Sequence, residues 1–143
     1  VSNPFGPGQF RFRRRGLFQA LVDSAYSGQK ISIRGNGFQE RDYLFSTDLC
    51  SIVFQLLELE ALPRVVNVAS GFSYSARQVI DILHSSHIFP IFEYIEIADD
   101  FEVKDSLVSN ELLRSLLSLH RDKLSPFRVE NVLEMRHYDE LEL

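Results

Sequence analysis

Apolar and polar residues follow two different periods along this chain, and the two periods separate helices from strands. Apolar residues at helical spacing predict helices over 17–27, 48–57, 76–83 and 109–119. Period-two alternation or a short β-branched run predicts strands over 31–34, 41–46, 65–70 and 92–98, the third of them buried. Because strands and helices alternate, we expect an α/β fold, whose strands normally belong to a parallel sheet.

Several helix ends carry recognisable signals. Gly28 follows the first helix as a stop, and Thr47 or Asp48 can cap the second. Ser75 with Gln78 three residues later matches a capping box. In the helix over 109–119 we expect four leucines to face inward: Leu112, Leu113, Leu116 and Leu117. Beyond Pro126 a last amphipathic helix is predicted from Val129, Val132, Leu133 and Leu141.

Composition and charge narrow the classes of function. A chain of 143 residues with 45% hydrophobic and 24% charged residues suits one globular domain. The net charge is −5 overall, but +2 over residues 1–92 and −7 over 93–143, so an anion is better placed in the front part. The acidic balance disfavours a nucleic-acid binder, and no apolar run is long enough for a membrane span. Cys50 is the only cysteine, which favours a reducing compartment, and we expect a cytoplasmic protein.

Three stretches carry a family resemblance: SNPFGPGQ, GLFQALVDSAYSGQKISIRGNGFQERDYLFSTDL and VVNVASGFSYSARQVIDIL. Together they resemble the C-terminal part of the extended short-chain dehydrogenase/reductases, the NAD-dependent nucleotide-sugar epimerases and dehydratases. The block G-N-G-x-Q-x-R-D-Y-x-x-x-x-D-L, from Gly35 to Leu49, is its most specific element. The resemblance covers residues 1–119, and we expect residues 120–143 to form an acidic helical extension.

The resemblance implies which parts of the parent fold are present. We expect a substrate-binding lobe plus the last strand–helix units of a Rossmann-type doubly wound sheet, with the N-terminal dinucleotide-binding half absent. The chain holds no Gly-rich phosphate-binding loop, and its one Tyr-x-x-x-Lys spacing, Tyr26 and Lys30, is interrupted by Gly28. We therefore expect no catalytic residue here. NAD would serve the parent enzyme, without binding tightly to this chain alone.

The resemblance also implies substrate-binding residues. Arg41 matches the arginine that contacts the diphosphate, and its planar fork suits phosphate oxygens. The alternative for Arg41 is an ion pair with Glu40, Asp42 or Asp48. Asn3 matches an asparagine at the substrate phosphate or sugar; the alternative, compatible with the first, is that its side chain closes an Asx turn before Pro4.

Further matches lie along the first helix and strand. Gly16 and Leu17 match the helix start that approaches the substrate, where free N–H groups suit an anion. Ser32, Ile33 and Arg34 match the strand that meets the nucleotide base through backbone groups. Arg34 replaces an aromatic residue often found there, so it either stacks on the base or points to solvent. Ser2 matches a backbone contact to the cofactor.

One family feature is missing. A second diphosphate arginine normally follows the strand predicted over 92–98, and this chain has EIADDFEVKDS instead. Lys104 is the nearest cation, while Asp99 and Asp100 repel phosphate. Of the two arginines that the resemblance implies for the diphosphate, this chain therefore has only Arg41 at a matching position.

The remaining motifs have simpler explanations. The basic run from Arg11 to Arg15 is interpreted as a solvated loop in preference to a nucleic-acid contact. His84 and His87 are interpreted as surface residues because no third metal ligand accompanies them. Cys50 is expected in the core, and Asp48 is expected to cap a helix.

Two functions remain open from the sequence. The first is the nucleotide-sugar-binding portion of an epimerase or dehydratase, completed by the missing Rossmann half or by a second copy. The second is a degenerate, non-catalytic binding or interaction module of the same fold.

Overall fold

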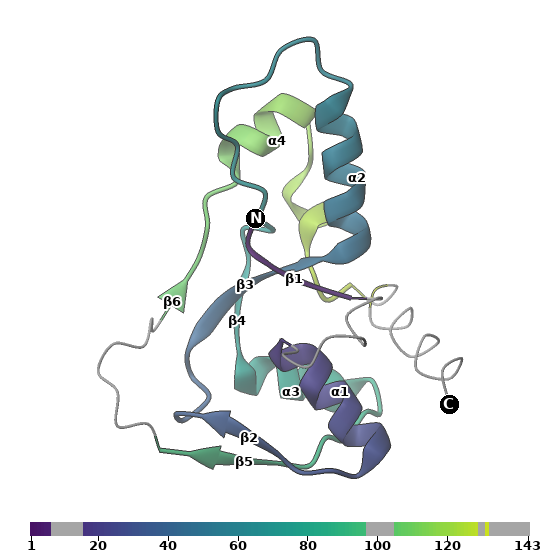
Figure 1. Cartoon of the computed structure of the whole chain (residues 1–143), viewed down its shortest axis with the longest axis vertical. Helices are drawn as coiled ribbons and strands as arrows, with labels where there is room; N and C mark the ends of the chain where they lie inside the picture. The colour runs from purple at the N-terminus through teal and green to yellow at the C-terminus, as the bar shows by residue number, and fades with distance from the viewer. Residues whose placement is uncertain (7–15, 97–104, 129–130, 132–143) are drawn as a thin grey trace. The chain divides into compact units, whose positions relative to one another are not determined.

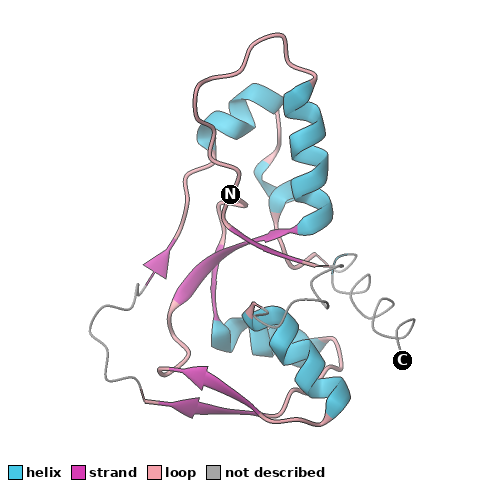
Figure 2. Cartoon of the chain, in the orientation of Figure 1, coloured by secondary structure: helices cyan, strands magenta, loops and turns pink. Residues whose placement is uncertain are grey.

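The computed structural model describes residues 1–6, 16–96, 105–128 and 131 (Figure 1). In chain order the elements are β1 (Asn3–Phe5), α1 (Leu17–Ser27), β2 (Ile31–Arg34), β3 (Glu40–Phe45), α2 (Ser46–Leu57), β4 (Ser73–Ser75), α3 (Ala76–Ser85), β5 (Phe92–Ile95), β6 (Asp105–Ser106), α4 (Glu111–Leu117) and the 3-10 helix η2 (Arg121–Leu124). Figure 2 shows how short most of the strands are beside the helices.

The strands pair in parallel, as the alternation of strands and helices predicts. β1 pairs with β3, β2 with β5, and β3 with β6, each in parallel register. With four α-helices in the described part of the chain, the α/β class is confirmed.

The chain divides into two compact units, each described here by itself. The first comprises the described residues of Val1–Pro7, Asp42–Phe72 and Leu107–Leu143. The second comprises those of Gly8–Arg41 and Ser73–Ser106.

The first unit is built around β1, the second half of β3, and α2. Its buried core consists of Leu44, Ile52, Leu56, Val68, Leu113 and Leu124. Phe5 at the end of β1 packs edge-on against Tyr43 and Phe45 of β3, and Phe127 joins the same aromatic cluster. Residues 120–128, expected to begin a separate extension, thus contribute Leu124 and Phe127 to the packing of this unit.

The second unit packs α1 and α3 with the parallel pair β2–β5. Gly28 ends α1 in the left-handed conformation, with φ at +70°, as predicted. The Ser24 hydroxyl of α1 both donates to and accepts from the backbone of Ile91, which fixes the start of β5. The capping box is confirmed, since Ser75 and Gln78 bond each other's backbone N–H groups at the start of α3.

One predicted strand is absent, and one helix begins earlier than predicted. Residues 65–70 form no strand, and only Val68, Ala69 and Ser70 are buried while Val65 is 71% exposed. The Val68 carbonyl accepts from the Ser2 N–H, so this segment is held to the N-terminal residues within the first unit without forming a strand. α2 begins at Ser46, with Phe45 at its N-cap and no capping side chain, so the predicted caps Thr47 and Asp48 are wrong.

Other differences concern exposure and length. Cys50 is exposed instead of lying in the core, and Leu112 is half exposed where it was expected to face inward. The strand expected over 92–98 ends at Ile95, with Glu96 outside it and residues 97–98 outside the described residues. The helix expected over 109–119 is shorter, and the one expected beyond Pro126 lies almost wholly outside the described residues. In the described ranges, no helix is long and apolar enough to cross a membrane.

Candidate nucleotide-sugar site

β2 presents one bonded edge and one open edge. The N–H groups of Ile31 and Gly35 donate to the carbonyls of Ile91 and Ile95, so odd-numbered positions face β5. In a parallel strand the backbone groups of the alternate residues point to the opposite edge. The sheet holds only β2 and β5 among the described residues, which leaves the backbone groups of Ser32 and Arg34 on an open edge.

The side chains of β2 alternate as the sequence predicts. Ile33 is buried, while Ser32 and Arg34 are exposed. The Ser32 hydroxyl donates to Glu93 Oε1 at 3.2 Å, and Glu93 also pairs with Lys30. These two partners lower the pKa of Glu93, the Lys30 contact being the larger cause. Arg34 lies in solvent, which leaves its guanidinium accessible to a ligand.

A pocket of about 500 Å³ lies at the carboxyl ends of β2 and β5. It is lined by Gly35, Asn36, Arg77, Tyr94, Ile95 and Glu96. Ligands in parallel α/β sheets bind outside the carboxyl ends of the strands, so this pocket occupies the expected place. The sequence alone assigned no binding role to any of its lining residues. The Gly-Asn-Gly turn after a strand was the signal that marked this position.

Arg41 lies in β3, in the part that pairs with β6. Its Nη1 donates to the Glu40 carbonyl at 2.8 Å, and its side chain is half-buried. Two of its alternative partners are engaged by other groups: Asp48 binds Arg128, and Asp42 binds Ser70. The phosphate-binding role of Arg41 stays a prediction.

The N-terminus of α1 also lies in the second unit. Gly16 occupies the N-cap in an extended conformation with no side-chain cap, and Leu17 begins the helix. No acidic residue lies in the first turn, and a Cβ built on Gly16 meets nothing within 4 Å among the described residues. Gly16 at the N-cap thus contributes no capping side chain, which fits the predicted approach of an anion.

Ser2 and Asn3 lie in the first unit, next to Asp42. Asn3 Nδ2 donates to the Asp42 carbonyl at 2.8 Å, so its amide bridges β1 and β3. The Ser2 hydroxyl oxygen is buried without a hydrogen-bond partner among the described residues. Asp42 itself is fully buried and accepts from the N–H groups of Ser70 and Gly71 at 3.1 and 3.0 Å.

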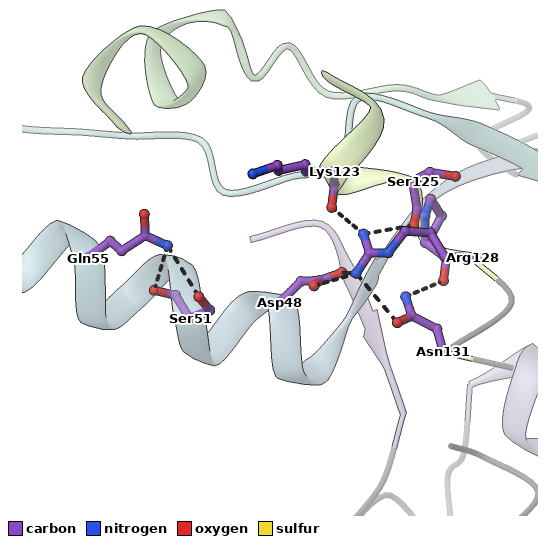
Figure 3. Close-up of polar contacts among 8 residues, drawn as sticks. Asp48, Ser51, Gln55, Lys123, Ser125, Arg128 and Asn131 are labelled. Atoms are coloured by element: carbon purple, nitrogen blue, oxygen red, sulfur yellow. Dashed lines mark hydrogen bonds and ion pairs between the residues drawn. The ribbon is translucent and has the colours of Figure 1, made fainter. Parts of the chain in front are cut away.

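A second pocket, of about 570 Å³, lies in the first unit beside α2. Arg128 Nη2 donates to both carboxylate oxygens of Asp48, at 2.8 and 3.0 Å (Figure 3). Arg128 also donates to the carbonyls of Lys123 and Ser125, and the buried Asn131 amide donates to the Pro126 carbonyl. Through these hydrogen bonds, Arg128 links the chain after η2 to α2.

The other sequence candidates do not assemble a site in the described residues. His84 and His87 are exposed as predicted, and no described group of three His, Cys, Asp or Glu residues is arranged to hold a metal ion. The basic run at 11–15, the acidic pair Asp99–Asp100 and Lys104 lie outside the described residues. Tyr26 lies on α1 and Lys30 lies beyond its end, where the lysine pairs with Glu93.

Part of the chain matches a known protein family. Residues 1–69, just under half of the chain, match the model of the NAD dependent epimerase/dehydratase family. A dTDP-4-dehydro-6-deoxyglucose reductase from Escherichia coli is 28% identical over 83 residues, which are 58% of this chain and 26% of that protein.

Solved structures match over nearly the whole chain. A UDP-N-acetylglucosamine 4-epimerase from Methanobrevibacter ruminantium, in complex with UDP-N-acetylmuramic acid, aligns over 99% of this chain and 45% of its own, with a TM-score of 0.81 and 22% identity. A UDP-glucose 4-epimerase from Thermotoga maritima, with UDP-glucose, aligns over 98% and 44%, with a TM-score of 0.79 and 19% identity. The chain therefore spans less than half the length of these relatives. The solved structures show that this chain shares the α/β fold of nucleotide-sugar epimerases.

Proposed function

We propose that this chain is the nucleotide-diphosphate-sugar-binding, C-terminal portion of an NAD-dependent sugar epimerase or dehydratase. The observation that carries the proposal is the open edge of β2, which ends at the pocket formed by Gly35 and Asn36. Such an edge offers backbone donors and acceptors to a planar base, and the next strand brings Arg41 for a diphosphate. Similar structures are described in complex with UDP-sugars, which supports this ligand class. A cytoplasmic setting is part of the proposal.

NAD and the catalytic acid/base pair would come from outside this chain. A dinucleotide-binding fold holds pyrophosphate against a Gly-rich turn at a helix N-terminus, and the sequence has no such loop. Ser2 would contribute a minor contact: its N–H already bonds Val68, and its buried hydroxyl is left for a ligand. When bound, NAD supplies hydride transfer at the sugar, and the residues of this chain only bind and orient that sugar.

The first prediction is that nucleotide-sugar affinity depends on Arg41. Replacing Arg41 with Ala removes a charged, bidentate phosphate contact, and we expect the Kd for UDP-glucose to rise roughly 30- to 150-fold. The measurement is calorimetric titration of the chain with UDP-glucose, GDP-mannose and dTDP-glucose. Arg64→Ala is the matched control, because Arg64 is an exposed arginine in the other unit and should leave the Kd unchanged.

Two outcomes would count against the proposal. Equal affinities of Arg41→Ala and the unmodified chain remove Arg41 from the site. No binding of any nucleotide sugar by the unmodified chain favours the second candidate function, a non-catalytic interaction module. The exposed apolar residues of α2, Phe54 and Leu57, are the observation that favours this second function, because such residues are typical of a protein interface.

A further inference from the structure

Arg77, in the first turn of α3, holds the Gly35–Gly37 turn by its backbone and by its side chain. Its backbone N–H donates to the Gly37 carbonyl at 3.2 Å, and its Nε donates to the Asn36 carbonyl at 2.9 Å. Its guanidinium carbon lies 4.4 Å from the centre of the Phe38 ring. A cation over an aromatic ring is attracted by the electrons of its face. The turn and the residue after it are therefore both fixed to α3.

Tyr94 of β5 is a further aromatic partner of the Arg77 side chain. The Arg77 guanidinium carbon lies 4.9 Å from the centre of the Tyr94 ring, which itself packs edge-on against Phe92. Gly37, with φ at +78°, lies so close to Tyr94 that an added Cβ would come within 2.5 Å of Cε1. The side chain of Arg77 thus fills the space between Phe38 and Tyr94, where it fixes the turn against β5.

The position of this turn matters because the turn joins the two parts of the proposed site. It follows directly from the open edge of β2, and four residues after Gly37 the chain reaches Arg41. A shift of the turn would change both where the backbone of Arg34 meets a base and where Arg41 meets a diphosphate. Misplacement of binding groups by about 1 Å is enough to weaken a ligand complex strongly.

We propose that Arg77 is a positioning residue for nucleotide-sugar binding, acting through the Gly35–Gly37 turn. The inference rests on the proposed function, since it concerns the same site. It differs from a direct phosphate contact because the Arg77 side chain is already engaged by Asn36, Phe38 and Tyr94. Glu96 on the lining of the same pocket would also weaken the attraction of an anion there.

The test compares Arg77→Lys and Arg77→Ala with the unmodified chain. Both variants retain the backbone N–H bond to Gly37, and Lys retains the charge, but neither can donate from Nε to Asn36 in the same plane. We expect both to weaken UDP-glucose binding about tenfold in calorimetry. We also expect the amide NMR signals of Gly35 and Gly37 to move in the ligand-free state, while the melting temperature changes little.

Controls separate positioning from charge and from general stability. Arg64→Ala removes an equivalent surface charge in the other unit and should alter neither the Kd nor the amide signals. Phe38→Ala removes one stacking partner at an exposed position, and its effect on the Kd should not add to that of Arg77→Lys, because both act on one cluster.

The outcomes distinguish this inference from the proposed function. If the unmodified chain binds no nucleotide sugar, the proposed function fails and the inference fails with it. If the unmodified chain binds and Arg77→Lys binds equally well, only the inference is overturned. Weaker binding with unmoved signals of Gly35 and Gly37 would also overturn it, because the residue would then contact the ligand directly.

Discussion

Glu93 on β5 contacts both Ser32, a predicted site residue, and Lys30. Its carboxylate pairs with Lys30 and accepts from the Ser32 hydroxyl, and these contacts hold its pKa below the ordinary value. We expect Lys30→Ala to raise the pKa of Glu93, because the largest cause of the lowering is removed. Carbon-detected NMR titration of the side-chain carboxyl measures it.

A second variant, Ser32→Ala, tests whether the Lys30 contact lowers the pKa of Glu93 more than the Ser32 contact does. Ser32→Ala should raise the pKa of Glu93 by less than Lys30→Ala does. Because the pKa is lowered in the folded state, the contribution to stability is present above the unfolded pKa and is lost as the pH falls through the folded pKa. An unchanged Glu93 titration in Lys30→Ala would contradict the pairing.

At the scale of residues, short sequence motifs predicted the backbone conformation well, but they did not predict which side chains contact one another. Gly28 was expected to stop the first helix, and it does so with φ at +70°. The pocket after β2 depends on Arg77 and Tyr94, which are distant in sequence and meet only through packing. The amide contact from Asn3 to Asp42 was missed for the same reason, since 39 residues separate the two.

At the scale of elements, the ion pair between Asp48 and Arg128 joins α2 to the chain after η2. Both side chains are about four-fifths buried, at 18% and 22% exposed, and the carboxylate receives two hydrogen bonds. Asp48→Ala would remove two charge-assisted hydrogen bonds from the partly buried guanidinium, so we expect a loss of about 2 kcal/mol in the free energy of unfolding. Urea denaturation measures this loss.

Gln55→Ala is the control for that prediction. Gln55 lines the same pocket from the same helix, and in the described part of the chain its side-chain amide donates to Ser51 alone, so we expect a change below about 0.5 kcal/mol. Similar losses in the two variants would show that Arg128 contributes nothing to the stability of this unit.

The elements themselves were predictable where the local pattern agreed with the final packing. α1, β2 and α3 carry a left-handed glycine, a clean alternation and a capping box. The bounds of α1 and β2 match the prediction, and α3 begins where expected and ends two residues later. The run over 65–70 has the composition of a strand, but strand formation needs a neighbouring strand in register, which composition cannot report. α2 is apolar on more than one face, so its pattern did not reveal that Cys50 is exposed.

At the scale of the whole molecule, α2 leaves an apolar surface in solvent. Val53, Phe54 and Leu57 are 42%, 70% and 71% exposed, whereas Ile52 and Leu56 are buried. Exposed apolar surface favours association, so we expect the chain to self-associate in sedimentation velocity and to bind an apolar dye. Phe54→Lys should reduce both effects, and Ser51→Lys, an exposed polar position on the same helix, should not.

A well-behaved monomer without dye binding would contradict that expectation. It would mean that the α2 surface is covered within the molecule. The similar structures extend over more than twice the length of this chain, and under the proposed function we expect this surface to pack against the dinucleotide-binding half.

The last prediction concerns activity. The chain alone should neither bind NAD tightly nor convert a nucleotide sugar, because it has no Gly-rich loop for the pyrophosphate and no tuned proton donor beside the sugar. Tyr26 and Lys30 have the right spacing, but Lys30 lies beyond the end of α1 and pairs with Glu93. The lysine therefore does not lie on the same helix turn as Tyr26, where it would lower the pKa of the phenol.

The assay follows NADH absorbance and product formation with UDP-, GDP- and dTDP-sugars. We expect no turnover by the pure chain, and turnover only after a separately expressed dinucleotide-binding half is added, since that half would carry both missing groups. Tyr26→Phe is the informative variant. Turnover by the pure chain that disappears in Tyr26→Phe would make Tyr26 and Lys30 the catalytic pair, and the chain would then be an enzyme by itself. Turnover in the reconstituted mixture that survives Tyr26→Phe would place the proton donor in the added half and leave substrate binding to the residues around β2.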